Sequence, residues 1–384
     1  MQNNKQSQVI LPNQTIGIIG GGQLGRMMAI SARYMGYKIV VLDPTPNCPT
    51  AQVADQQIVA AYDDMEAIQE LTELSDVVTY EFENVDLNAA RYIENKSKLP
   101  QGAYALEITQ NREKEKTLIK ELGLPVPTFA IVNNAAETEQ ALSDFPLPAV
   151  IKTCRGGYDG KGQLKIESAD QIKEAAQFAE HLGQNGTKCI IEQWIRFDKE
   201  MSVVFSRAQN GDITFFPISE NEHKHHILHK TTVPAHVSQT VLEQAYEAAT
   251  LLGEKMNIVG TFAIEMFVKG DDIYINEMAP RPHNSGHYSI EACNVSQFDQ
   301  HIRAICGLPL PKIELLKPAI MINILGEDLD HALAYIKTHR EGSLHLYGKE
   351  EAKAQRKMGH ITFTGTSVDD VLHKVKTYEE GIII

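Results

Sequence analysis

Two glutamates twelve residues apart, Glu265 and Glu277, carry the clearest chemical signal in the sequence. They lie in two short apolar segments around a turn, which predicts a β-hairpin. If the turn is Gly270–Asp272, Lys269 pairs with Ile273, and Glu265 then faces Glu277. Directly opposed side chains in an antiparallel pair have Cβ atoms about 4.5–5.5 Å apart, so two like charges repel. A cation would relieve that repulsion, and Mg²⁺ suits carboxylate ligands with substrate phosphates as its other partners.

The hairpin alone leaves two other arrangements open. A two-residue turn would shift the pairing by one position and bring Glu265 opposite Asn276. Both glutamates could also point to water from an edge strand, where solvent would screen their charges. A metal site and a solvated surface are therefore both compatible with this segment.

Length and composition define the class of protein. The 384 residues predict two or three domains, and 43% hydrophobic with 22% charged residues is ordinary for a globular chain. A net charge of −14 argues against a nucleic-acid-binding protein, whose surface would be basic. The polar start and the lack of a long apolar run predict neither a secretory signal nor a membrane helix. Five scattered cysteines without a C-x-x-C pair favour a reducing cytoplasm.

The expected fold combines α/β and α+β regions. Repeated βα units predict a parallel sheet in an N-terminal domain at 1–107. Its expected strands are Thr15–Ile19, Lys38–Leu42, Ile58–Ala60 and Val77–Tyr80, and its expected helices are Arg26–Met35 and Met65–Leu74. Hairpins and helices then alternate in a two-lobed α+β region at 108–312, which opens with a charged helix at Asn111–Leu122. A small β-rich unit at 313–384 completes the chain.

A glycine-rich loop follows the predicted strand Ala149–Lys152. Its four glycines in seven residues free the backbone to approach a ligand, and successive N–H groups there can form an anion-binding nest. The loop lacks the G-x-x-x-x-G-K-[ST] pattern of a Walker P-loop and leads into a strand, Gln163–Ile166. With Lys152 before it and Lys161 within it, the segment predicts a hairpin lid over phosphate groups.

Two further segments place polar side chains beside apolar strands. Glu192 and Gln193 interrupt an apolar strand, and Glu200 follows it, as at the edge of a slot for an adenosine group. An edge strand fits the Glu-Gln segment equally well. Arg281 opens a rigid polar segment directly after the second glutamate of the hairpin. Its guanidinium could bind an oxyanion through two parallel hydrogen bonds.

The order of these features resembles the ATP-grasp superfamily. Within it, four motifs are similar to the family of N5-carboxyaminoimidazole ribonucleotide synthetases of purine biosynthesis. They are Gly20-Gly-Gly-Gln-Leu-Gly-Arg26, Tyr80-Glu-Phe-Glu-Asn84, Gly157-Tyr-Asp-Gly-Lys-Gly162 and Ala279-Pro-Arg-Pro-His-Asn-Ser-Gly-His287. The resemblance implies a Rossmann-like (pre-ATP-grasp) domain, a two-lobed ATP-grasp fold and a small C-terminal β-rich domain.

The resemblance also implies a ligase with a defined set of substrates. Such a ligase takes ATP, bicarbonate and 5-aminoimidazole ribonucleotide with Mg²⁺ (Mn²⁺ as an alternative), and it forms a homodimer. Bicarbonate would attack the γ-phosphorus to give carboxyphosphate, and the amine of the ribonucleotide would attack that intermediate or the CO₂ released from it. A closed lid would keep water from the labile intermediate.

Residue roles follow from the resemblance by motif position. Arg281 and Lys161 are implied to be catalytic, and Glu265 and Glu277 to bind the metal. The residues implied at ATP are Arg112, Lys152, Gly157, Tyr158, Asp159, Gly160, Lys161, Gly162, Gln163, Glu192, Gln193, Trp194, Ile195, Glu200, His223, Asn276 and Glu277. Those implied at the ribonucleotide are Tyr158, Asp159, Lys161, Lys349, Arg356 and one of Glu81 and Glu83, of which Glu81 is preferred.

Three other functions remain as alternatives. Gly20, Gly22 and Gly25 lie between a strand and a helix, with Asp43 after the next strand, which is the dinucleotide fingerprint of a dehydrogenase. The histidines of 223–229 could make a zinc module, although their spacing fits no familiar set and two lysines would repel the cation.

A different ligase of the superfamily, such as a formate-using transformylase or a biotin-type carboxylase, is the third alternative. It would differ only in the residues on the substrate side. Lys349 and Arg356, the expected phosphate anchors, could equally be solvated members of a charged run.

Overall fold

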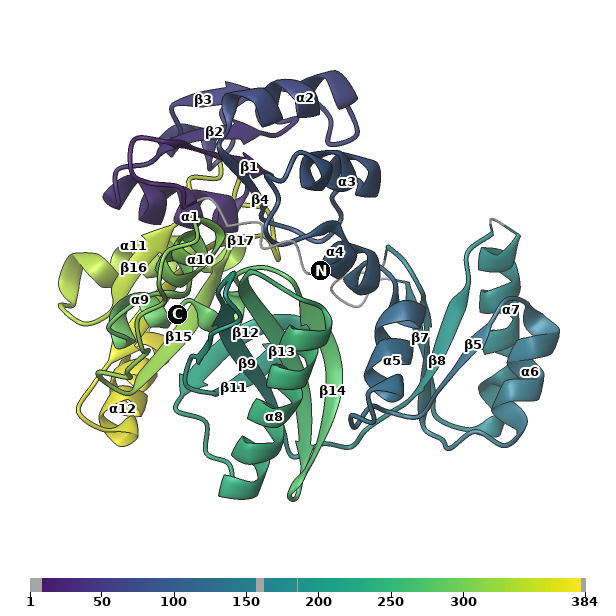
Figure 1. Cartoon of the computed structure of the whole chain (residues 1–384). Helices are drawn as coiled ribbons and strands as arrows, with labels where there is room; N and C mark the ends of the chain where they lie inside the picture. Colours follow the sequence, from purple (N-terminus) through teal and green to yellow (C-terminus); the bar gives the residue numbers. More distant parts are fainter. Residues whose placement is uncertain (1–8, 157–161, 185, 381–384) are drawn as a thin grey trace.

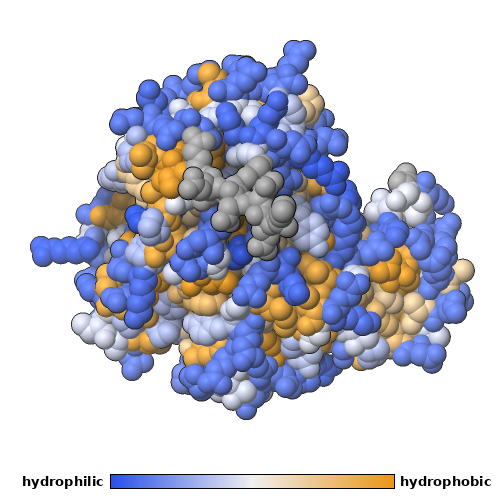
Figure 2. All heavy atoms as spheres, viewed as in Figure 1, coloured by the Kyte–Doolittle hydropathy of each residue, from blue (hydrophilic) through white to orange (hydrophobic). Residues whose placement is uncertain are grey.

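The computed structural model of the protein describes residues 9–156, 162–184 and 186–380 (Figure 1). Three β-sheets carry its cores, one parallel and two with antiparallel pairing. The face drawn in Figure 2 is polar over most of its area, with apolar side chains gathered in smaller patches. No helix in the described ranges is long and apolar enough to cross a membrane.

The N-terminal sheet is parallel, with strand order β3-β2-β1-β4, as the βα pattern predicts. Its elements are β1 (Thr15–Ile19), α1 (Gln23–Tyr34), β2 (Lys38–Leu42), β3 (Gln56–Ile58), α2 (Met65–Leu74), β4 (Val77–Tyr80), α3 (Leu87–Asn95) and α4 (Ala103–Thr109). One core includes α1 and another includes α2 and α3, so the sheet is covered on both faces and its strands are almost continuously apolar. Three of the four predicted strands have the predicted bounds, and β3 begins two residues earlier.

A small lobe follows, drawn on the right of Figure 1. Its antiparallel sheet has the order β5-β8-β6-β7, and α6 and α7 pack on it. The elements of this region are α5 (Arg112–Glu121), β5 (Phe129–Val132), α6 (Ala135–Ser143), β6 (Ala149–Thr153), β7 (Gln163–Ile166), α7 (Ile172–Gly183) and β8 (Cys189–Gln193). The glycine-rich segment therefore joins two paired strands, as predicted for a hairpin lid. Five of its residues lie outside the described residues: Gly157, Tyr158, Asp159, Gly160 and Lys161.

The largest sheet runs in the order β14-β13-β9-β11-β12-β15-β17-β16, with β10 paired to β9. Its strands are β9 (Lys199–Arg207), β10 (Ile213–Phe215), β11 (Ser219–Lys224), β12 (Ile227–Val233), β13 (Gly260–Lys269), β14 (Asp272–Ala279), β15 (Ala319–Leu325), β16 (Ser343–Leu346) and β17 (Lys357–Thr364). Because β12 pairs with β15, the C-terminal strands extend the central sheet. Helix α8 (Gln239–Lys255) packs on this sheet near β13 and β14, and α11 (Leu329–Thr338) and α12 (Val368–Glu380) cover its C-terminal strands.

The N-terminal domain and the central region share one apolar core. Helix α10 (Gln297–Ile305) packs against α1, and Phe298, Ile302 and Ile305 join the core beneath the parallel sheet. The short helix α9 (Ser289–Ala292) precedes α10. The loop from β14 to α9 thus runs along the junction between the two regions, and this loop carries Arg281.

Candidate active site

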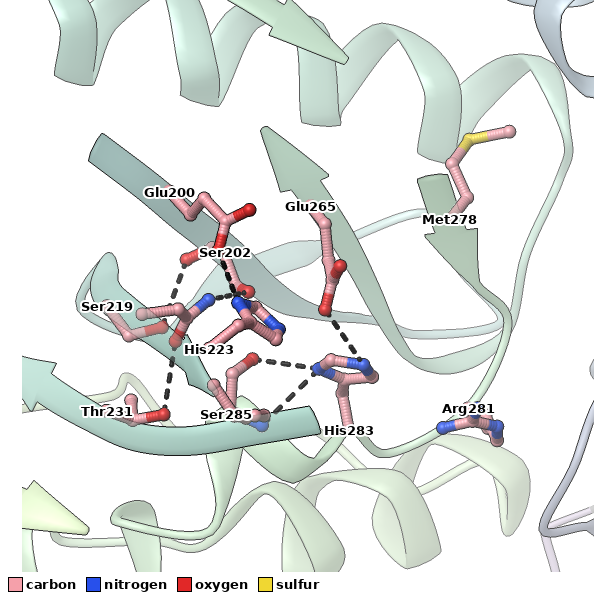
Figure 3. A network of polar contacts seen from close by, with 12 residues as sticks. Glu200, Ser202, Ser219, His223, Thr231, Glu265, Met278, Arg281, His283 and Ser285 are labelled. Carbon is pink, nitrogen blue, oxygen red and sulfur yellow. Dashed lines mark hydrogen bonds and ion pairs between the residues drawn. The ribbon is translucent and has the colours of Figure 1, made fainter. Parts of the chain in front are cut away.

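The two glutamates of the β13–β14 hairpin face each other, as predicted. Glu265 pairs with Glu277 in the antiparallel register. Figure 3 shows the Glu265 side chain directed toward His283 on the loop that follows the hairpin. The alternative pairing with Asn276 is therefore wrong.

The turn that produces this pairing differs from the predicted one. Lys269 pairs with Asp272 across a two-residue turn, so the predicted Lys269–Ile273 pair is wrong. Gly270 has a φ of 59°, in the left-handed region that glycine adopts at little cost, which permits the tight turn. A bulge beside Glu265 then takes up one extra residue of β14 and restores the glutamate pair.

Glu265 lies opposite a second carboxylate and beside a histidine. Its side chain is 17% exposed, and burial together with the charge of Glu277 raises its pKa. The Nε2 atom of His283 lies 3.3 Å from Glu265 Oε1. Burial and the nearby Arg281 hold the pKa of His283 well below its usual value. The histidine is therefore neutral near pH 7.

The tautomer of His283 follows from its other contacts. Its Nδ1 atom accepts a hydrogen bond from the backbone N–H of Ser285 at 3.3 Å, and Ser285 Oγ lies 2.9 Å from the same nitrogen (Figure 3). The proton of a neutral ring must then sit on Nε2, which faces Glu265. His283 thus donates to Glu265 without cancelling its charge.

Arg281 lies on the same loop and pairs with Glu83. Its Nε and Nη2 atoms lie 2.7 and 2.6 Å from Glu83 Oε2. Burial raises the pKa of Glu83, but the charge and the hydrogen bond of Arg281 together outweigh burial, and the pKa lies below its ordinary value. Glu83 comes from the segment after β4, so the N-terminal domain orients a guanidinium that the central region supplies.

The neighbouring Glu81 has a different environment. Its carboxylate accepts hydrogen bonds from the backbone N–H groups of Gly22 and, at 2.7 Å, Gly25. The N–H of Gly21 donates to Asp43 Oδ2 at 2.7 Å. The glycine turn that would bind the pyrophosphate of NAD therefore binds the protein's own carboxylates.

The small lobe contributes a buried ion-pair group. Glu192 lies 2.6 Å from Lys152 Nζ and 3.3 Å from Lys116 Nζ, and its side chain is 4% exposed. Burial raises the pKa of Glu192, but the two lysines outweigh it and lower the pKa to about 2. Strand β8 is interior to its sheet, so the edge-strand interpretation of the Glu-Gln segment is wrong.

Lys116 is a site residue that the sequence did not reveal. It belongs to the charged helix α5, where the residue pattern predicts no role for it. Its side chain is only 2% exposed, and its Nζ also donates to the backbone oxygens of Asn276 and Ile275. The adjacent Glu115 accepts from Met278 N–H at 2.8 Å, and burial raises its pKa to about 8. Helix α5 thereby ties the small lobe to the glutamate hairpin.

Known proteins resemble this chain over nearly all of its length. Family models match a ribonucleotide synthetase preATP-grasp domain at residues 13–110, an ATP-grasp domain at 117–298 and a phosphoribosylaminoimidazole carboxylase C-terminal domain at 319–374. The N5-carboxyaminoimidazole ribonucleotide synthase of Bacillus subtilis (strain 168) is 48% identical, with 96% of each chain covered. The chain belongs to the family of N5-carboxyaminoimidazole ribonucleotide synthases.

Solved structures of that family agree. A crystal structure of a synthetase in complex with ADP is 51% identical, with a TM-score of 0.93 over 97% of this chain and 98% of that one. A synthase from Aspergillus clavatus in complex with ADP and 5-aminoimidazole ribonucleotide is 30% identical, with a TM-score of 0.87 over 96% and 98%. Membership makes this chain an ATP-grasp ligase of purine biosynthesis, and the dehydrogenase and the zinc module are excluded as its function.

Other residues that the synthase resemblance predicts at the nucleotide lie in the region of the small lobe or in the segment that connects it to β9. Arg112 Nη1 donates to Thr153 O at 3.0 Å, and Gln163 pairs with Lys152 in the hairpin. Trp194 stacks under Lys165, whose Nζ lies 4.3 Å from the ring centroid. Gly162 precedes β7, Gln193 ends β8, and Ile195 is buried just beyond it.

The histidine-rich segment forms the hairpin β11–β12, with its turn at His225 and His226, which both have positive φ. His223 Nδ1 bonds to Glu200 Oε2. Burial lowers the pKa of His223, but this hydrogen bond and the charges of Glu265 and Glu200 together outweigh burial and raise the pKa. The structure thus brings Glu200 and His223 together. In the described ranges no group of three or more His, Cys, Asp or Glu is placed to hold a metal.

The C-terminal unit brings Lys349 close to Glu81 of the N-terminal domain. Lys349 donates to Lys357 O at 2.7 Å, and burial and the nearby Arg356 lower its pKa to about 8. Arg356 is exposed and donates to Glu351 O at 2.9 Å. The neighbouring Gly348 accepts from Gln52 of the N-terminal domain at 2.8 Å. Lys349 is therefore no solvated charge.

Proposed function

We propose that this chain carboxylates 5-aminoimidazole ribonucleotide in two steps through carboxyphosphate. An oxygen of bicarbonate attacks the γ-phosphorus of ATP, and ADP leaves. The exocyclic amine of the ribonucleotide then attacks the carboxyl carbon of carboxyphosphate, or the CO₂ released from it. Phosphate leaves, the amine loses a proton, and N5-carboxyaminoimidazole ribonucleotide results.

The facing glutamates are the observation that carries this proposal. Glu265 and Glu277 are hard oxygen ligands with like charge, and burial and that charge already raise the pKa of Glu265. Such a pair fits Mg²⁺ with phosphate oxygens as its remaining ligands. When bound there, Mg²⁺ would neutralise the phosphates during transfer. Asn276, the extra residue at the bulge, lies beside them.

The residues around the hairpin have separate roles in the first step, the transfer of the γ-phosphoryl group to bicarbonate. Lys152 and Arg112 bind the phosphates, and the lid Gly157–Gln163 closes over them to exclude water. Arg281 binds the bicarbonate oxyanion, and Glu83 fixes the plane of its guanidinium. Lys161 acts with Arg281. The adenine lies along Glu192, Gln193, Trp194 and Ile195, and the ribose and nucleotide contact Glu200 and His223.

The ribonucleotide lies where the three regions meet. Its phosphate is bound by Lys349 and Arg356, and its aminoimidazole by Tyr158, Asp159, Lys161 and Glu81. The complex of the Aspergillus clavatus relative with ADP and 5-aminoimidazole ribonucleotide supports a site for both molecules. Domain limits at 107/108 and 312/313 are part of the same proposal, supported by family models that leave residues 111–116 and 299–318 between the three matched domains.

We further propose a cytoplasmic homodimer. The five cysteines are all buried and unpaired, which suits a reducing compartment. The homodimer rests on the family resemblance alone, and sedimentation at micromolar concentration tests it.

Release of ADP is the experiment that tests the proposed reaction. The rate is measured with ATP, Mg²⁺ and bicarbonate, with and without 5-aminoimidazole ribonucleotide. The proposal predicts strong stimulation by the ribonucleotide. Stimulation by formate with glycinamide ribonucleotide in its place would contradict the assignment.

A further inference from the structure

The loop that carries Arg281 and His283 has little regular structure of its own. Between β14 and α9 the loop forms a single 3₁₀ turn, Asn284–Gly286. Loop positions need outside support to hold a catalytic geometry within the tolerance that chemistry requires. Two buried glutamines supply contacts to its backbone. Gln101 Nε2 donates to Pro280 O at 3.0 Å, and the second glutamine, Gln297, makes a larger set.

The side-chain amide of Gln297 forms hydrogen bonds with both backbone groups of His283. Its Oε1 accepts from His283 N–H at 2.9 Å, and its Nε2 donates to His283 C=O at 2.7 Å. Nε2 also lies 3.0 Å from His287 Nδ1, and burial holds the pKa of His287 well below its usual value, so that ring nitrogen can accept. Exchanging the amide oxygen and nitrogen would set acceptor against acceptor. The orientation of this amide is therefore unique.

The surroundings of Gln297 are shaped for this amide. The side chain is fully buried at the first position of α10, where Ser289 Oγ accepts from Gln297 N–H at 3.0 Å and Thr261 Oγ1 donates to its C=O at 2.9 Å. A Cβ atom on Gly286 would lie 2.5 Å from Gln297 Oε1. The glycine leaves the space that the amide occupies.

We infer that Gln297 is a positioning residue for the carboxylation reaction. By fixing the peptide units on both sides of His283, it sets the donor that faces Glu265 and, two residues earlier, the guanidinium of Arg281 (Figure 3). It acts through those residues and contacts no substrate. Because α10 packs on α1, the same amide links the loop to the N-terminal domain. This inference rests on the proposed function.

The same helix provides a matched control. Gln300 is also fully buried, three residues further along α10, and its Nε2 donates to Pro311 O at 2.8 Å and Thr214 Oγ1 at 3.1 Å, away from the loop. Gln297→Met and Gln300→Met each remove buried hydrogen bonds while keeping a similar volume. If the two glutamines only stabilised the fold, both variants would change kcat and melting temperature in the same way.

The test compares kcat, KM and melting temperature in these two full-length variants. Since a misplacement of about 1 Å costs about 10²-fold in rate, Gln297→Met is expected to lower kcat about 10- to 100-fold, with KM for ATP changed less than about threefold. Gln300→Met is expected to keep kcat within about twofold despite a lower melting temperature. Equal kcat values in the two variants would overturn the inference.

A second variant covers the case in which Gln297→Met does not fold. Gln297→Glu keeps the shape and the acceptor for His283 N–H, but its carboxylate faces the carbonyl of His283. Its kcat is expected to fall, and a wild-type kcat would overturn the inference. ADP release by the wild type that the ribonucleotide fails to stimulate would instead count against the proposed function, so the two failures are distinguishable.

Discussion

Glu81 and Glu265 are two glutamates predicted at one site, and their surroundings are opposite. Burial raises the pKa of both carboxylates. Both carboxylate oxygens of Glu81 accept hydrogen bonds from backbone N–H groups at the start of α1. Glu265 instead lies opposite Glu277 and beside a neutral imidazole. The contrast indicates that Glu81, besides its proposed contact with the aminoimidazole, belongs to the framework, whereas the hairpin pair is built for a ligand.

The largest effect should come from Glu277→Gln. The substitution removes one metal-binding charge without changing volume, so turnover should fall by about 10³-fold or more, as for a lost electrostatic contact in the transition state. The melting temperature should not fall, because repulsion of Glu265 disappears. Steady-state ADP release and thermal unfolding measure the two outcomes.

Glu243→Gln is the control for this change, since Glu243 is an exposed glutamate on α8. It should leave both turnover and melting temperature unaltered. Wild-type turnover in Glu277→Gln would contradict the contrast between Glu81 and the hairpin pair, because Glu277 would then matter no more for turnover than a surface glutamate.

Arg356→Ala should raise KM for the ribonucleotide. Loss of a charge-assisted bond to phosphate costs about 1.5–3 kcal/mol, which is about 10- to 100-fold in KM. KM for ATP should change less than about twofold, because the nucleotide lies elsewhere in the site. Initial rates at varied concentrations of each substrate measure both constants, with the exposed Arg340→Ala as control. Equal changes for the two substrates would contradict the phosphate-anchor role.

Glu81→Gln should affect stability. The amide keeps one acceptor for the glycine turn but presents its NH₂ to the second N–H donor. Leaving that buried donor unpaired costs about 1–3 kcal/mol of unfolding free energy. Urea unfolding of this variant and of Glu277→Gln sharpens the comparison, since only the first should be destabilised. An unchanged unfolding free energy for Glu81→Gln would show that Glu81 is not part of the framework.

The smallest effect concerns pH. The pKa of Lys349 is lowered to about 8, so the ammonium is charged below that pH and neutral above it. Phosphate binding needs the charged form, and KM for the ribonucleotide should therefore rise a few-fold between pH 7 and pH 9. Lys349→Arg should flatten this rise. A KM that is constant or falls over the range in the wild type would contradict the role.

Elements with strong local patterns could be predicted from the sequence. β1, β2, β4 and α2 have the predicted bounds because apolar runs and glycine turns specify them locally. The continuation of the central sheet from β12 into β15 was not foreseen. Those strands lie far apart in the chain, and their pairing depends on long-range packing that no local pattern reports.

The candidate site, like the fold, could be predicted where local residue patterns specify it. Facing glutamates, the lysine of β6 and the arginine loop follow from residue type and spacing. The bulge beside Glu265 could not be read, because a turn and a bulge that compensate each other leave the same pairing as the predicted turn. Lys116 was missed because its helix is highly charged, and only the fold shows that this one face is buried against β14.

Isothermal titration calorimetry of the wild-type protein with ATP tests the central claim most directly. With Mg²⁺ present, the facing glutamates should give saturable binding that weakens at least about tenfold when EDTA removes the metal. Glu277→Gln should bind ATP with nearly the same weaker affinity whether or not Mg²⁺ is present. Equal wild-type affinity with and without Mg²⁺ would contradict the account.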